Sequence, residues 1–208
     1  MIVDIHSHIL PGVDDGASDF EIAKQMIRMS YDEGCRHLFL TPHADAFNTK
    51  GVNAEDMKSI IKKIRKGIYP TLNGTNYVLI EFYLGGFVLE DISKDIMRLT
   101  DAGYTPVIAH AERYGVSYDS LCELKEMGCL MQLNLCDVRF DSSNEMCLMA
   151  TKMLDNELFD FIGTDAHGMD RRSPTMKSYI DQLYNHYNKN YIDELTWKNA
   201  EKFLGVLL

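Results

Sequence analysis

The chain has 208 residues, of which 46% are hydrophobic and 25% are charged, and its net charge is −10. This length fits a single globular domain over residues 1–208 with a sizeable core, and the negative charge argues against nucleic acid as a partner. No apolar stretch is long enough to insert into a membrane and no signal peptide precedes Asp4. The five cysteines are scattered without a C-x-x-C pair, which fits a reducing compartment. We therefore expect a cytoplasmic protein.

Short apolar runs alternate with helical patterns along the sequence. The run Ile2-Val3 predicts a first strand, and Ser18-Asp19-Phe20-Glu21 predicts a capping box that opens a helix ending at Gly34. Strict alternation of strands and helices predicts a parallel sheet covered by helices. The other predicted strands cover residues 37–41, 77–80, 105–109, 129–133 and 159–164, and the other predicted helices cover residues 53–66, 89–103, 117–128, 145–154, 175–189 and 193–204.

The stretch Asp4-Ile5-His6-Ser7-His8 places two histidines two residues apart after the first strand. In an extended strand, residues i and i+2 point to the same face, so both imidazoles are aimed at one spot. Imidazole is the commonest side-chain ligand for transition metals, and two that converge form half of a metal site. A histidine pair that only hydrogen-bonds to the backbone remains the alternative for this motif alone.

Metal-competent side chains also follow the later strands. The C-terminal ends of parallel strands meet on one face of a β/α barrel, where active sites collect. Five strand ends that each carry such a group predict a multinuclear metal site. These groups are His6 with His8, His43, Glu81, His110, and Asp165 with His167. A closed barrel needs about seven or eight strands, whereas only six are predicted, and the gap lies between His43 and Glu81.

Five motifs together carry a family resemblance: D-I-H-S-H-I-L-P-G-V-D-D-G, T-P-H, L-I-E-F, V-I-A-H-A-E-R-Y and T-D-A-H. This set resembles the PHP (polymerase and histidinol phosphatase) superfamily. Within it, the chain is most similar to the manganese-dependent protein-tyrosine phosphatases of Gram-positive capsule and exopolysaccharide operons. The resemblance extends from Met1 to the last helix. It implies an α/β fold, a distorted (β/α)7-type PHP barrel that here is one strand short between residues 43 and 81.

The resemblance also implies roles for individual residues. Two or three metal ions are expected, with Mn²⁺ favoured and iron or zinc left open. The ligands would be His6, His8 and Asp165 for the first ion, Glu81 and His110 for the second, and Asp15, His43 and His167 for the third.

The same resemblance assigns Arg113 and Arg172 to the substrate phosphate, because a guanidinium fork matches phosphoryl oxygens. Taken without it, each arginine would more readily form a surface ion pair. Asp14 is a candidate weak acid that assists the leaving group. The rival thiol mechanism needs C-x5-R, and no cysteine has an arginine six residues later. Cys136, after the fifth strand, is interpreted as a buried thiol near the site.

One element expected from the resemblance is missing from the sequence. Relatives carry a Gly-x-Glu strand between the T-P-H and I-E-F motifs, and its glutamate bridges the first two metals. No such motif is present here, and the nearest acids, Glu55 and Asp56, fall in a predicted helix. We therefore expect weaker or incomplete metal occupancy.

The leading functional hypothesis is a metal-dependent phosphatase of phosphotyrosine, acting on the tyrosine-rich tail of a bacterial tyrosine kinase that controls polysaccharide synthesis. Two alternatives stay open: a catalytically impaired relative that binds metal or phosphoprotein, and a phosphatase of small phosphomonoesters. A homo-oligomer is compatible with all three. The basic stretch Lys58–Lys66 predicts an amphipathic helix with a charged outer face, with docking as the alternative role.

Overall fold

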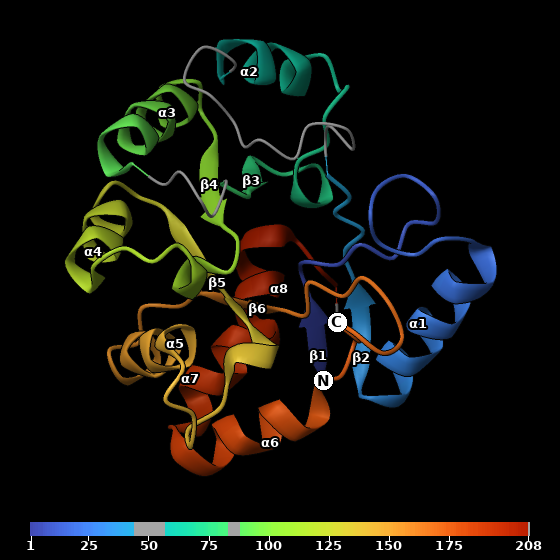
Figure 1. The fold of residues 1–208 in the computed structure, drawn as a ribbon. Helices are drawn as coiled ribbons and strands as arrows, with labels where there is room; N and C mark the ends of the chain where they lie inside the picture. The colour runs from blue at the N-terminus through green and yellow to red at the C-terminus, as the bar shows by residue number, and fades with distance from the viewer. Residues whose placement is uncertain (44–56, 83–87, 208) are drawn as a thin grey trace.

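The computed structural model describes residues 1–43, 57–82 and 88–207 and contains six strands, all paired in parallel (Figure 1). Apolar and β-branched residues predominate in five of these strands, as expected for strands covered on both faces, whereas the segment Cys35–Leu38 contains Arg36 and His37. The strands are β1 (Ile2–Asp4), β2 (Cys35–Leu38), β3 (Tyr77–Ile80), β4 (Thr105–Ile108), β5 (Leu130–Asn134) and β6 (Phe161–Gly163).

Helices follow the strands in the expected alternation. Four of them begin at a residue whose side chain accepts a backbone N–H: Asp19 before α1, Ser117 before α4, Asn144 before α5 and Asn188 before α7. The helices are α1 (Phe20–Asp32), α2 (Met57–Arg65), α3 (Leu89–Asp101), α4 (Tyr118–Glu126), α5 (Glu145–Asp155), α6 (Lys177–His186), α7 (Lys189–Asp193) and α8 (Asn199–Leu204), with a π-helical turn (Glu194–Lys198) between the last two.

The strands form two sheets, one with the order β1-β2 and one with the order β3-β4-β5-β6. Just beyond the strands, the chain after β6 bonds to the chain after β1: Asp165 N–H donates to His6 O at 2.8 Å, and His8 N–H donates to Ala166 O at 2.9 Å. The spatial sequence is therefore β3-β4-β5-β6-β1-β2. This order places the C-terminal ends of all six strands on one face.

The expected barrel is not closed. No strand among the described residues joins β2 to β3, so the structure supports a mixed α/β fold with parallel sheets and not a complete barrel. The interval predicted to be one strand short, residues 43–81, contains α2 and the predicted strand β3 in its described part, and no further strand among its described residues. Glu55 and Asp56, considered above as substitutes for the missing glutamate, lie outside the described residues, as does Asn53, the predicted start of the second helix.

Two apolar clusters hold the strands in place. The larger one fills the space between the sheet and helices α2 to α7, and includes Ile108, Leu133 and Ile162, none of which is exposed. The smaller one lies on the other face, where β1 and β6 pack against α8. Burial on both faces fixes the positions of the strand ends.

Several predicted boundaries shift in the structure. The second strand covers residues 35–38 and not 37–41, although Phe39 and Thr41 still donate backbone hydrogen bonds to the chain of β1. The cap of α1 is Asp19 and not Ser18, because the Asp19 carboxylate accepts from two helix N–H groups. The last helical segment begins at Lys189, before the predicted residue 193. No helix in the described ranges is both long and apolar enough to cross a bilayer.

Candidate metal centre

Three donor atoms converge after β1 and β6. His6 and His8 are almost completely buried, and their Nε2 atoms lie 3.1 Å apart. Oδ1 of Asp165 lies 3.6 Å from His6 Nε2 and 3.4 Å from His8 Nε2. The alternation of the strand, which sends residues i and i+2 to one face, accounts for the meeting of the two imidazoles.

The outer nitrogens of these imidazoles are held by other side chains. His6 Nδ1 lies 2.9 Å from Gln132 Oε1, and His8 Nδ1 lies 2.7 Å from Asp14 Oδ2. The Gln132 amide is fixed, because its Nε2 donates to Leu133 O and its Oε1 accepts the backbone N–H of His110. Both acceptors are oxygens, so the histidine protons reside on Nδ1.

The chemistry of this donor set fits a cation. Two Nε2 lone pairs at 3.1 Å repel each other unless a proton or a metal lies between them. Oδ1 of Asp165, although buried, has no hydrogen-bond partner among the described residues. Two neutral imidazoles and a carboxylate are a common ligand set for a divalent transition metal.

Glu81 and His110, at the ends of β3 and β4, form a second pair. Glu81 Oε1 lies 2.8 Å from His110 Nε2, and Glu81 Oε2 lies 3.2 Å from His43 Nδ1. His6, His8 and Glu81 also offer ligand atoms within 4.8 Å of one another. Glu81 therefore connects the second pair to the histidines that follow β1.

Asp15, His43 and His167 form the third group. Oδ1 of Asp15 lies 3.4 Å from Nε2 of both histidines, and these residues with His8 offer four ligand atoms within 4.8 Å. This side of the centre is open, since the Asp15 side chain is 67% exposed whereas that of His8 is 1% exposed. The structure thus brings all eight predicted ligands into one cluster.

Two of these ligands have left-handed backbone conformations. The φ angles are 32° for His110 and 53° for Asp165, a region that costs non-glycine residues about 1–3 kcal/mol. The His110 N–H donates to Gln132 and the Asp165 N–H donates to His6 O, which holds both conformations in place. Two of the five described non-glycine residues with a positive φ are thus predicted metal ligands.

Arg113 and Arg172 lie at the margin of the cluster. Both contact Oδ2 of Asp165, Arg113 through Nη1 at 3.3 Å and Arg172 through Nη2. Arg113 is also held through Nε by Asp137 Oδ2 at 2.6 Å. Asp165 therefore presents one oxygen to the histidines and the other to the two guanidinium groups. The positive charge of the two arginines, which suits an anion, thus lies directly beside the candidate metal ligands.

Asp14 is engaged on both carboxylate oxygens. Oδ2 is bonded to His8 Nδ1 and accepts the backbone N–H of His43 at 3.1 Å, and Oδ1 accepts the N–H of Gly16 at 2.9 Å. Burial raises the pKa of Asp14, but the hydrogen bonds from His8 and the backbone outweigh it and lower the pKa below its ordinary value. This placement favours an orienting role for Asp14 over proton donation to a leaving group.

Strand β5 contributes residues that the sequence prediction missed. Gln132 bonds to His6 and His110, and Asn134 Nδ2 donates to Asp165 Oδ2 at 3.1 Å. Both are completely buried in an otherwise apolar strand. Polar residues at i and i+2 in a buried strand must find partners on one face, and this pattern was the available signal.

Cys136 approaches the centre without acting as a nucleophile. Its Sγ accepts a hydrogen bond from Arg113 Nη2 at 3.0 Å. Burial and the neighbouring Asp137 raise the pKa of the Cys136 thiol to about 11, so it is protonated at neutral pH. This agrees with the absence of a C-x5-R motif.

Comparisons with known proteins agree with this architecture. The chain belongs to the family described as capsular polysaccharide synthesis, CpsB/CapC, whose model matches residues 2–60 and 49–205. It is 28% identical to the tyrosine-protein phosphatase CpsB of Streptococcus pneumoniae over 98% of both chains. It is 26% identical to the tyrosine-protein phosphatase YwqE of Bacillus subtilis (strain 168), over 98% of this chain and 91% of that protein.

A solved structure is also similar. It comes from the crystal structures of YwqE from Bacillus subtilis and CpsB from Streptococcus pneumoniae, described as unique metal-dependent tyrosine phosphatases. The TM-score is 0.80 at 26% identity, and the match covers 98% of this chain and 94% of the solved one. The alignment with the Streptococcus pneumoniae CpsB runs over 239 positions, so that protein has residues with no counterpart in these 208.

Proposed function

We propose that this protein is a metal-dependent protein-tyrosine phosphatase. The observation that carries the proposal is the meeting of His6, His8 and Asp165, with Arg113 and Arg172 on the second oxygen of the same aspartate. Family membership supports it, because the similar proteins are named tyrosine-protein phosphatases.

The metal ligands follow from the three groups of donors. We assign His6, His8 and Asp165 to the first ion, Glu81 and His110 to the second, and Asp15, His43 and His167 to the third, with Mn²⁺ as the proposed metal and iron or zinc as alternatives. Divalent cations held there would supply Lewis acidity and would activate water as a nucleophile at neutral pH. The Nδ1 contacts to Gln132 and Asp14 set the histidine tautomers that such ligation requires.

Arg113 and Arg172 bind the phosphate and neutralise charge on the transferring phosphoryl group. Asp137 fixes the Arg113 side chain through Nε, which leaves its two terminal amino groups to face the cluster and Cys136. Tyrosinate is a tolerable leaving group, because the pKa of tyrosine is about 10. In this assignment Asp14 orients His8, and no cysteine acts as a nucleophile.

Glu81 offers an answer to the missing Gly-x-Glu strand. Its carboxylate bonds to His110 and also lies within ligand-sharing distance of His6 and His8. Burial raises the pKa of Glu81, but His110, His6 and His43 outweigh it and lower the pKa to about 2, so the group is an anion. We propose that Glu81, together with His6, His8 and His110, would hold metal in place of the missing glutamate, which favours an active enzyme over a silent binding relative.

The proposed substrate is a phosphotyrosine protein, and the proposed partner is the tyrosine-rich tail of a bacterial tyrosine kinase in the cytoplasm. The test is a metal count on protein purified without chelator, followed by a phosphotyrosine-peptide assay with added Mn²⁺. Two or three ions with turnover support the proposal. One ion or none, with no turnover, would instead support the binding relative. Turnover of small sugar phosphates in place of the peptide would support the small-molecule phosphatase.

A test of the site uses His6→Ala and Arg113→Ala. We expect the first variant to lose metal and turnover, and the second to keep metal and lose turnover. Wild-type turnover in both variants would overturn the assigned site.

A further inference from the structure

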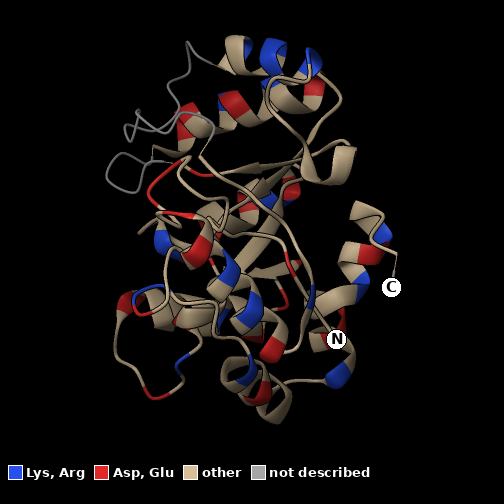
Figure 2. Ribbon diagram, turned by 90° about the vertical axis from the view of Figure 1, so that its right-hand side faces the viewer, with Lys and Arg blue, Asp and Glu red and all other residues tan. Residues whose placement is uncertain are grey.

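Helix α2 concentrates positive charge in a chain whose net charge is −10. Its buried side, Met57, Ile61 and Ile64, packs into the larger apolar cluster, so the polar residues face outward (Figure 2). Residues 57–66 contain five cations and no acid: Lys58, Lys62, Lys63, Arg65 and Lys66.

The helix dipole explains only part of this charge. Cations in the last turn, such as Lys62 and Arg65, are stabilised by the partial negative charge at the helix C-terminus. Lys58 lies four residues before Lys62, a like-charge spacing that costs a helix a few tenths of a kcal/mol. The presence of Lys58 therefore needs another reason.

On the neighbouring helix α3, cations form ion pairs with acids of the same helix. Lys94 lies 3.0 Å from Glu90, and Arg98 Nη1 lies 2.8 Å from Asp95 Oδ1. Lys58 and Arg65 on α2 form no ion pair with any residue in the part of the chain that the structure describes. The described residues therefore offer these two cations no carboxylate partner.

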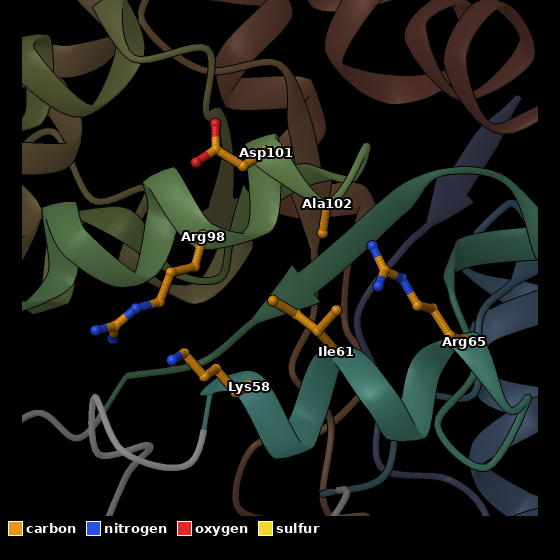
Figure 3. A pocket seen from close by; sticks show the side chains of 6 residues that line it. All are labelled: Lys58, Ile61, Arg65, Arg98, Asp101 and Ala102. Atoms are coloured by element: carbon orange, nitrogen blue, oxygen red, sulfur yellow. The ribbon is translucent and has the colours of Figure 1, made fainter.

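An open groove of about 390 Å³ lies between α2 and α3. In Figure 3, the ends of Lys58 and Arg98 gather at one end of it, and Arg65 reaches toward Ala102 at the other. The Asp101 carboxylate points away from α2 in this view. Ile61 lies between these ends and Asp101 also lines the groove. Arg98 is already paired with Asp95, so Lys58 and Arg65 are the lining cations without an ion pair among the described residues. The remaining lining therefore favours an anionic ligand with apolar atoms between its charges.

We propose that this groove docks an anionic peptide segment of the phosphoprotein substrate, one that carries acidic or phosphorylated side chains. This inference rests on the proposed function, since a phosphotyrosine protein brings such charges to a chain that is itself strongly negative. Lys58 and Arg65 are seven residues apart, about 10 Å along the helix, which suits an extended segment and exceeds the span of one phosphate. A local positive patch offsets the overall repulsion and orients the substrate.

The test compares two substrates with charge-reversal variants. One substrate is a long acidic peptide with several phosphotyrosines, and the other is p-nitrophenyl phosphate, which reaches only the metal centre. The variants are Lys58→Glu and the double variant Lys58→Glu/Arg65→Glu. The matched control is Lys24→Glu/Arg28→Glu, two exposed cations on α1 that produce the same change of net charge.

We expect the double variant to raise KM for the peptide roughly tenfold, with kcat unchanged and with unchanged constants for p-nitrophenyl phosphate. In the control variant, KM and kcat for both substrates should stay within about twofold of the wild-type values. Lys58→Glu should keep or raise the Tm, because a glutamate four residues before Lys62 replaces a like-charge spacing with an attractive one, and should still raise the peptide KM. A purely structural role for Lys58 predicts a lower Tm and an unchanged KM.

Two results would overturn the docking groove: an unchanged peptide KM in the double variant, or an equal rise of KM for both substrates. If the wild-type protein hydrolyses neither substrate, the proposed function fails, and docking is then measured separately. In that case fluorescence anisotropy of the labelled peptide should report binding to the wild-type protein that Lys58→Glu/Arg65→Glu weakens and the α1 control does not. Equal binding by all three would contradict the proposal.

Discussion

The two sides of the metal centre are built differently. On the deep side, His6, His8 and Asp165 are buried, and each is bonded to a residue outside the eight proposed ligands: Gln132, Asp14 and Asn134 respectively. On the open side, the side chains of Asp15, His43 and Glu81 are 67%, 34% and 29% exposed, and their ring and carboxylate contacts are to one another and to further proposed ligands.

This difference predicts an order of metal affinity. Ligands that the fold holds in place lose little freedom when a cation binds, whereas ligands held only by each other must be ordered by the cation itself. We therefore expect a tight site at His6, His8 and Asp165, and a weaker site at Asp15, His43 and His167.

The largest effect should come from the deep side. Asp165→Asn removes the charge that faces both histidines and both arginines, and we expect kcat/KM for a phosphotyrosine peptide to fall by roughly 10³-fold or more. Excess Mn²⁺ should not restore it. Recovery of activity at millimolar metal would show that Asp165 is dispensable for the tight site.

A smaller loss is expected from Gln132, which bonds to His6 and His110 without being a ligand. Gln132→Leu should weaken metal binding about 10- to 100-fold, as measured by competition with a chelating dye. Gln132→Glu keeps an acceptor oxygen for His6 and should therefore bind metal more tightly than Gln132→Leu does. Equal weakening in both variants would point to packing and not to orientation of His6.

The smallest of these effects is expected on the open side. Asp15→Asn should reduce turnover by about tenfold at low metal, and added Mn²⁺ should restore it, because the remaining donors still form a weak site. The measurement is a Mn²⁺ titration of activity beside that of Asp165→Asn. If Asp15→Asn loses as much turnover as Asp165→Asn and added Mn²⁺ does not restore it, the two sides do not differ in the way proposed.

The sequence predicted the deep side well because strand alternation and strand order are strong signals. His6 and His8 had to share a face, and the parallel βα pattern had to bring residues such as Asp165 and His110 to the same edge. The orienting residues were harder to find. Gln132 and Asn134 are neither charged nor typical metal ligands. Their role is visible only from the hydrogen-bond partners that their buried amides need.

The sequence predicted six strands with a gap between residues 43 and 81, but it did not predict the precise boundaries. The expectation of a PHP-type barrel came from the family resemblance, and the described residues contain no strand between β2 and β3 that would close it. The cap of α1 moved from Ser18 to Asp19, since a carboxylate accepts two backbone N–H groups where the serine hydroxyl here donates to Asp19. Competition between two adjacent capping residues depends on local geometry, which a motif does not specify.

The central claim is that the fold prepares the deep side for metal and leaves the open side to be ordered by it. The most direct measurement is a calorimetric titration of chelator-treated protein with Mn²⁺, repeated on Asp15→Asn. We predict at least two classes of sites in the wild-type protein, and loss of only the weaker class in the variant. A single class of equal sites, or loss of the tight class in Asp15→Asn, would contradict the account.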